Sequence, residues 1–355
     1  MDEIIDLYSD YLISSFGQVT ATGLSELMGG QISHDKITRE LAGPKQTGRE
    51  LWHSVKRLVR QMESEEGVLI VDDSIAEKPC SDENELISWH WDHSQDRAVK
   101  GINFVTAMYH SQGVSLPVGY ELIKKTEQYF DAKTQKMKRR SEVSKNEIAL
   151  VLIAQSVKNQ IPFRTVLADV WYASVENMRF VRKDMNKHFV MPLKSNRKVA
   201  LSKHDHQHGC YVKVEDLVLE PHAIVQIWLE DLAFPLLLVK QVFTHEDGTT
   251  GVLYLVTSDL DLTYDEITAL YQKRWNVEPF HKSLKQNASL TQSPAHTPNT
   301  QTNHVFAAMC GYVKLEMLKV STKLNHFALR QRIYVHALQH AFAELQKLKP
   351  LKLAA

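Results

Sequence analysis

Apolar residues recur at helical spacing in two stretches near the start of the chain, residues 3–16 and 50–62. Between them, TATGLSELMGG and QISHDKITRELAG predict two short helices around a Gly-Gly turn. This pattern would suit a helix-turn-helix whose second helix carries His34, Lys36 and Arg39, and it equally suits a plain helical bundle. We therefore expect a helical N-terminal domain, a candidate DNA-binding domain, over residues 1–64.

The pattern changes at residue 67, where GVLIVDDS forms a short apolar run that ends in two acids and predicts a buried strand. Further strands are predicted over 103–123, which holds two of them around a Gly turn, and over 163–174 and 188–193. Residues 145–160 and 176–187 have helical periodicity, and the basic segment 130–140 is predicted to be a loop. Strands that alternate with helices indicate an α/β layer fold.

Residues 194–257 interrupt this alternation with four β-rich runs and a predicted turn at HEDGTTG, which together predict an antiparallel β insertion. Helical patterns return from residue 263. We expect a catalytic core in two parts, 65–193 and 258–325, on either side of the 194–257 insertion, and a C-terminal helical region over 326–355.

Composition limits the function. Lys plus Arg equals Asp plus Glu, 42 each, so a protein that coats nucleic acid by bulk charge is excluded and any polyanion must meet local basic patches. Three cysteines without a CxxC pair favour a reducing cytoplasm. No run approaches the ~18 apolar residues of a membrane helix, and the acidic N-terminus is unlike a secretory signal. The two basic patches are Lys133, Lys136, Lys138, Arg139 and Arg140, and Lys194, Arg197, Lys198 and Lys203.

Two acids follow predicted strands. Asp72 ends LIV and Asp169 ends TVLA. Functional side chains collect beyond the carboxyl ends of strands in α/β sheets, although a single Asp there is more often a turn or helix cap. Asp73 competes with Asp72, and on an extended strand the two side chains point to opposite faces.

A third acid lies in LTYDEITALYQKRWNVEPFHKSLKQ, where Thr263 and Glu266 form a capping box that marks a helix start. At 100° per residue, one narrow helical face carries Tyr271, Arg274, Glu278, Lys282 and Lys285. Such a polar face cannot be a buried core stripe. An exposed face would be explained by the i,i+4 pair of Arg274 and Glu278, but that pair does not explain Tyr271 and Lys285. The proline that follows Glu278 predicts a kink or bulge.

Three carboxylates are typical of a magnesium site, because Mg²⁺ prefers hard oxygen ligands. Two such ions can activate a nucleophilic hydroxyl and stabilise the leaving oxygen of a phosphoryl transfer. The neighbouring Arg and Lys side chains would bind backbone phosphates.

At these residues the sequence resembles the bacterial insertion-sequence transposases of the DDE class. That group carries Y-(2)-R-(3)-E-(6)-K, and Tyr271, Arg274, Glu278 and Lys285 fit every spacing. Its first acid tends to read hydrophobic-D-x-[ST], which VDDS matches with Asp72, and its second ends a strand, as in LADVWYAS. Trp275, Phe280, His281 and Lys282 also match the group.

The resemblance implies a ribonuclease-H-like mixed sheet with flanking helices, related to the retroviral integrases and interrupted by the β insertion. It implies cleavage of transposon ends and strand transfer into target DNA, with two Mg²⁺ per site (Mn²⁺ substituting). The catalytic and metal-binding residues would be Asp72, Asp169 and Glu278. The DNA-binding residues would be Tyr271, Arg274, Trp275, His281, Lys282, Lys285, Arg139 and Arg140.

The implied partner is double-stranded DNA, as terminal inverted repeats and as target, bound by a homodimer in the cytoplasm at the nucleoid. Many members of the group pass through a DNA hairpin with a flipped base stacked on an aromatic residue, for which Trp275 and, in the insertion, Trp228 are candidates. Two alternatives stay open: a metal-dependent nuclease without strand transfer, and a DNA-binding protein without catalysis.

Two other segments could carry chemistry. Residues 203–210 contain His204, His206, His208 and Cys210, which could imitate a zinc site but lack finger spacing, so a polar loop is the stronger interpretation. The aromatic segment WHWDH at 89–93 would either contact DNA or cover the sheet.

Overall fold

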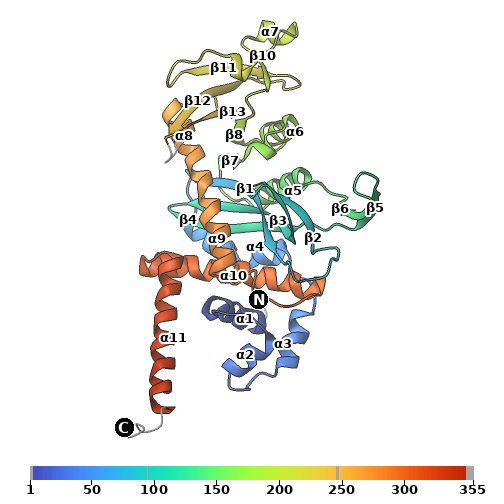
Figure 1. Ribbon diagram of the computed structural model, residues 1–355. Helices are drawn as coiled ribbons and strands as arrows, with labels where there is room; N and C mark the ends of the chain where they lie inside the picture. Colours follow the sequence, from blue (N-terminus) through green and yellow to red (C-terminus); the bar gives the residue numbers. More distant parts are fainter. Residues whose placement is uncertain (1–2, 94, 245–247, 349–355) are drawn as a thin grey trace.

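The computed structural model describes residues 3–93, 95–244 and 248–348 (Figure 1). Four helices begin the chain: α1 (Glu3–Ser14), α2 (Ala21–Leu27), α3 (His34–Leu41) and α4 (Gly48–Met62). Each of the last three starts at a hydroxyl N-cap, Thr20, Ser33 and Thr47. Gly29 and Gly30 between α2 and α3 have φ of 59° and 76°, which glycine adopts without strain. The two short helices around a Gly-Gly turn are therefore present as the sequence predicted.

Five strands form the centre of the sheet: β1 (Val68–Glu77), β3 (Arg97–Ser111), β4 (Val114–Leu122), β7 (Thr165–Ala168) and β8 (His188–Leu193). Their spatial order is β4-β3-β1-β7-β8. β3 runs antiparallel to β1 and β4, whereas β7 and β8 run parallel to β1. This is the mixed-sheet topology of a ribonuclease-H-like fold, and the α/β prediction is confirmed. A further strand, β2 (Ser88–Asp92), pairs with the start of β3.

The β-rich segment continues this sheet. Its antiparallel strands are β9 (Lys198–Ala200), β10 (Val212–Lys213), β11 (Ile224–Leu229), β12 (Leu236–Thr244) and β13 (Thr250–Thr257). Because β13 pairs antiparallel with β8, the described residues form one 11-stranded sheet. Figure 1 shows these strands as the upper end of the molecule. Two short helical segments, α7 (Lys203–Gln207) and η3 (Val214–Asp216), lie within the same stretch.

The basic segment predicted to be a loop is instead a two-stranded hairpin, β5 (Glu127–Asp131) and β6 (Lys136–Arg140). Cross-strand ion pairs explain the difference, since Glu127 pairs with Arg140 and Asp131 with Lys138. Figure 1 shows the hairpin standing away from the central sheet.

Helices cover both faces of the sheet. α5 (Lys145–Lys158) contacts β3 and β4, and α9 (Val277–Gln286) contacts β1. α8 (Tyr264–Gln272) and the 3₁₀ turn η4 (Lys273–Asn276) precede α9, and α10 (Pro298–Thr322) and α11 (His326–Leu348) follow it. The predicted helix over 176–187 is divided into α6 (Val175–Arg179) and the π-helical turn η2 (Phe180–Asp184).

The core lies between these helices and the sheet, where β1 is fully buried from Val68 to Val71. Over the described ranges, no helix has both the length and the apolar content to span a bilayer. The three cysteines are free, as their spacing predicted.

Candidate active site

Two neighbouring strands bring the first two predicted acids together. Asp169 follows the end of β7 as predicted, but the prediction that Asp72 ends its strand was wrong, because β1 continues through it to Glu77. β1 and β7 are parallel neighbours, and Val71 pairs with Ala168. Asp72 and Asp169 each follow a member of that pair, so both acids lie at the same level of the sheet, where β7 ends. The apolar runs that precede them are buried, which fixes the register and therefore the position of both acids.

The alternative first acid, Asp73, points to the other face of the sheet. Its carboxylate accepts hydrogen bonds from Lys145 Nζ at 2.6 Å and from the Tyr172 hydroxyl at 3.0 Å. Lys145 is the first residue of α5, whereas Asp72 faces Arg274, which precedes α9. Asp73 therefore has partners within the protein and Asp72 faces the predicted glutamate helix.

Both acids have raised pKa values. Burial, with smaller contributions from Asp169 and Asp73, raises the pKa of Asp72 to about 7, although Arg274 acts in the opposite direction. Burial also raises the pKa of Asp169. The backbone N–H of Trp171, which donates to the Asp169 carboxylate at 2.9 Å, acts in the opposite direction and lowers this pKa. The site therefore favours a cation between the two carboxylates.

The predicted glutamate helix is broken. α8 ends at Gln272, η4 follows, and α9 begins at Val277. The predicted kink is present, but it lies before Pro279, which occupies the first turn of α9, where its missing N–H costs no helical hydrogen bond. The expectation of one continuous face was wrong for this reason, and Tyr271 is buried while Glu278 remains exposed.

Arg274 links the first and third acids. Its guanidinium lies 3.6 Å from Asp72 Oδ2 and 3.9 Å from Glu278 Oε1. It also stacks over the rings of Tyr271, at 5.5 Å, and Trp275, at 4.8 Å. Its side chain is 10% exposed and that of Glu278 is 57% exposed, so the arginine is packed within the protein and the glutamate faces solvent.

A cavity of about 510 Å³ opens beside Asp169. Its walls come from η4, the end of α8 and the sheet strands β8, β12 and β13, and they include Tyr271, Arg274, Trp275, Leu193 and Leu253. The Trp275 side chain, half exposed, forms part of this wall. A flat apolar group can therefore enter next to the acids.

The other predicted DNA-binding residues of α9 differ in their surroundings. His281 packs edge-on against Phe104, and burial lowers its pKa to about 3, so the imidazole is neutral. Lys282 is exposed and lies over the Phe327 ring. Burial lowers the pKa of Lys285, which lies toward the far end of β1. On the hairpin, Arg139 and Arg140 are partly or fully exposed.

The donor set fits a divalent cation in part. Among the described residues, no three His, Cys, Asp or Glu side chains lie close enough together to hold a metal as they stand. Asp72 and Asp169 supply hard carboxylate oxygens, and the negative charge of Asp169 contributes to the raised pKa of Asp72, an effect that a divalent cation would reverse. The third carboxylate, Glu278, is occupied by Arg274.

The remaining candidates have no part in this site. His204 and His208 stack at 4.1 Å on and beside α7, a short helix where a loop was expected, and no three-ligand group forms there in the described chain. Trp228 lies on β11, several strands from β1. Trp89 and Trp91 are half exposed, whereas His90 between them is buried, so the two tryptophans do not cover the sheet.

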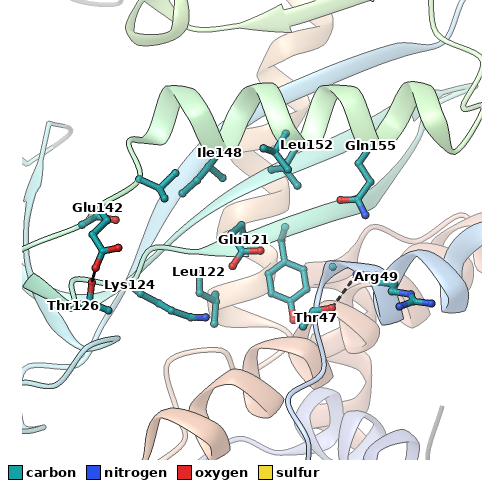
Figure 2. A pocket seen from close by; sticks show the side chains of 15 residues that line it. Thr47, Arg49, Glu121, Leu122, Lys124, Thr126, Glu142, Ile148, Leu152 and Gln155 are labelled. Carbon is teal, nitrogen blue, oxygen red and sulfur yellow. Dashed lines mark hydrogen bonds between the residues drawn. The ribbon is translucent and has the colours of Figure 1, made fainter.

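A second cavity, of about 560 Å³, lies between the start of α4, the edge strand β4 and α5 (Figure 2). Figure 2 shows Glu121 and Lys124 below α5, with Thr126 donating to Glu142 at one end. Burial raises the pKa of Glu121. This cavity borders α5 and contains none of the three predicted acids.

The sequence matches two protein families over ranges that include the three predicted acids. Residues 3–210 match the family described as DDE superfamily endonuclease, and residues 134–314 match the family described as transposase DDE domain. Each match spans more than half of the chain, so the chain belongs to the DDE superfamily. Within that class it is a DNA transposase, and the resemblance noted in its sequence is confirmed at the level of the superfamily.

Solved structures are also similar to this chain. The solved structure titled "Drosophila P element transposase strand transfer complex" is similar at 9% sequence identity, covering 99% of this chain and 88% of that chain with a TM-score of 0.27. No curated protein matches the sequence.

Proposed function

We propose that this transposase cuts DNA at the terminal inverted repeats of its element and joins the freed 3′ ends to target DNA, with Asp72, Asp169 and Glu278 as its catalytic residues. The observation that carries the proposal is that Asp72 and Asp169 directly follow the paired residues Val71 and Ala168 of two parallel strands, with Arg274 connecting Asp72 to Glu278. DDE enzymes in general use divalent metal ions, and the charge of this pair calls for a cation.

The cofactor we propose is Mg²⁺, two ions per site, with Mn²⁺ as a substitute. Asp72 and Asp169 would hold the metal, and the exposed Glu278 would join them by exchanging its ion pair with Arg274. When bound, the metal would activate the attacking oxygen and stabilise the leaving one. Asp73 stays with Lys145 and Tyr172, which hold this part of β1 in place.

The DNA would lie along η4 and α9. Once released by the carboxylates, Arg274 can bind a phosphate bidentately, with Tyr271 beneath it to hold its orientation. Lys282 and Lys285 would contact the backbone further along, and Arg139 and Arg140 would do so from the hairpin. His281, neutral and packed on Phe104, would support the helix.

Further parts of the proposal concern how the DNA ends are recognised. Trp275 beside the 510 Å³ cavity could stack on an unpaired base, as a hairpin route would require. The N-terminal helices would bind the ends specifically, because α3 exposes His34, Lys36 and Arg39 beyond the Gly-Gly turn. We propose that two copies act together on the two ends.

The test is an in vitro reaction with labelled element ends, a supercoiled target plasmid and Mg²⁺ or Mn²⁺. Asp72→Asn, Asp169→Asn and Glu278→Gln should each reduce cleavage by roughly a hundredfold or more while end binding stays intact. Asp265→Asn, at an exposed acid of α8, is the matched control and should cleave normally.

Each outcome has a distinct meaning. Normal cleavage by any of the three variants would remove that residue from the site. Cleaved ends that never join the plasmid would identify a nuclease rather than a strand transferase. If the parent protein binds the ends but does not nick them in either metal, DNA binding without catalysis would be its remaining function.

A further inference from the structure

The hairpin of β5 and β6 projects from the catalytic core as a two-stranded sheet of its own (Figure 1). Its turn is tied in place by Asp131. The carboxylate of this residue accepts hydrogen bonds from the backbone N–H of Lys133 and from the Thr134 hydroxyl, each at 2.9 Å. The hairpin is therefore a shaped projection that can meet a ligand without first having to fold.

One face of the hairpin satisfies its own charges. Side chains alternate between the two faces of a strand pair. On the first face, Glu127 pairs with Arg140 across the strands. Asp131 pairs with Lys138 on the same face. The Arg140 guanidinium also lies over the Tyr129 ring, at 5.8 Å from its centroid. This face holds the two strands together.

The opposite face is apolar at its centre. Phe130 and Met137 lie directly opposite one another across the two strands. Opposed side chains on one face of a strand pair are near neighbours, so the two form a single apolar ridge. Phe130 is 56% exposed and Met137 is 61% exposed, so the rest of the protein does not cover this ridge. We call it the Phe130–Met137 pair.

Positive charge surrounds the Phe130–Met137 pair. Residues 127–140 contain five basic and two acidic side chains, a net charge of +3 in a chain that is neutral as a whole. Lys133, in the turn, and Lys136, beside Met137, are exposed and form no ion pair within the described chain. A fitting ligand must therefore present anions on its outside and apolar surface within. Duplex DNA does so, with phosphates outside and stacked bases inside.

The hairpin is close enough to the candidate active site to meet the same DNA. Lys145, whose Nζ lies 2.6 Å from Asp73, follows Arg140 by five residues, which span at most about 18 Å. The Phe130–Met137 pair lies three residues further along the strands, about 10 Å. The ridge is thus on the order of 30 Å or less from the predicted acids, about nine base pairs along a duplex.

We propose that the Phe130–Met137 pair is a wedge that enters between two neighbouring base pairs of the DNA held at the active site, unstacks them and kinks the duplex. Phenylalanine and methionine are among the side chains that proteins insert into base steps, and a two-stranded ribbon fits a groove of DNA. Lys133 and Lys136 contact the phosphates on either side of the step. This inference rests on the proposed function for its DNA substrate, but not on cleavage.

The test follows base unstacking by the full chain in EDTA, so that no strand is cut. One duplex carries an element end and another has an unrelated sequence, as a target. Each contains 2-aminopurine, a base whose fluorescence rises when it is unstacked, at successive positions within about ten base pairs of the cleavage or insertion point. The parent at saturation should raise the fluorescence several-fold at one step. It should also bind a duplex mismatched at that step about tenfold more tightly, because the mismatch removes part of the cost of unstacking.

Variants separate the wedge from the charge around it. The double change Phe130→Ser and Met137→Ser should abolish both the fluorescence rise and the preference for the mismatch. Phe130→Leu keeps an apolar wedge and should retain both. Lys136→Gln is the matched control: it should weaken binding to both duplexes and reduce the salt slope by about 0.9, while the rise at saturation stays that of the parent. All of these positions are exposed, and equal thermal melts would confirm that the variants fold.

A rise in the end duplex alone would assign the wedge to the element ends, and a rise in the unrelated duplex would assign it to the target; either supports the proposal. No rise at any position with the parent bound would overturn it. An equal rise in the double variant would also overturn it and leave the exposed pair to a protein partner. A parent that unstacks DNA but never cuts it in Mg²⁺ would refute the proposed function alone, and one that cuts without unstacking would refute this inference alone. A parent that binds neither duplex would refute both.

Discussion

Replacing Asp72 by asparagine should stabilise the metal-free protein while removing its activity. Burial and the nearby carboxylates raise the pKa of Asp72 from 3.8 to about 7. The difference corresponds to about 4 kcal/mol by which the ionised carboxylate destabilises the fold above pH 7. Asparagine keeps the acceptor for the Asp73 N–H, at 2.9 Å, but loses the ion pair with Arg274. We therefore expect a net gain of about 1–3 kcal/mol at pH 8.

The pH dependence follows from the sign of this shift. The folded state binds the proton of Asp72 more tightly than the unfolded chain, so the parent loses stability as pH rises from about 4 to about 7. The gain of Asp72→Asn should be absent at pH 4 and complete at pH 8. With about 1–2 °C per kcal/mol for a chain of this length, the melting temperature at pH 8 should rise by roughly 1–6 °C.

Thermal melts in EDTA and in Mg²⁺ at both pH values provide the assay. Mg²⁺ should stabilise the parent but not Asp72→Asn, because only the parent offers the paired carboxylates. Asp265→Asn should change stability by no more than about 0.5 kcal/mol in every condition. A lower melting temperature for Asp72→Asn at pH 8, or the same rise at pH 4 and pH 8, would refute the reasoning.

Three other changes test the site and its support. Glu316 is buried against Ser115, Lys319 and His326, and its hydrogen bonds to them hold its pKa below 4.5 against the effect of burial. Glu316→Gln should therefore lower the free energy of unfolding in urea by about 3 kcal/mol at pH 7. This loss should become smaller as the pH falls below about 4.5. An unchanged cost at pH 3.5 would contradict this. Lys285→Ala should weaken DNA binding and reduce the salt slope by about 0.9, and an equal slope would mean that this lysine touches no phosphate. Gly101→Ala would push a Cβ into the Ala76 carbonyl oxygen and should lower the free energy of unfolding by about 1–3 kcal/mol. Gly113→Ser, at an open turn, tests only the strain of a positive φ and should lower it by less.

Much of the fold could be predicted because it follows from local patterns. The apolar run before Asp169 ends where β7 ends, whereas β1 continues past Asp72 to Glu77, because the apolar pattern shows only the buried part of a strand. The capping boxes at Thr47 and Thr263 mark helix starts from four neighbouring residues alone. The order of strands and helices, and with it the position of two acids, therefore came from the sequence.

Local patterns were insufficient where partners lie far apart in the chain. The hairpin β5–β6 was predicted to be a loop because its residues are polar, yet ion pairs across the strands organise it. The break at η4 places Arg274 against Asp72, which precedes it by about 200 residues, and separates Glu278 from the pair it was expected to join.

The sequence by itself determined which side chains are chemically equipped to act: three carboxylates, the arginine between two of them, and the basic residues around them. Only the tertiary structure decided that Asp72 rather than Asp73 faces the glutamate helix, that Arg274 occupies the place between the first and third acids, and that the β5–β6 hairpin leaves Phe130 and Met137 uncovered. Periodicity reports which face of an element is apolar, but the neighbour of that face is set by the packing of segments distant in sequence.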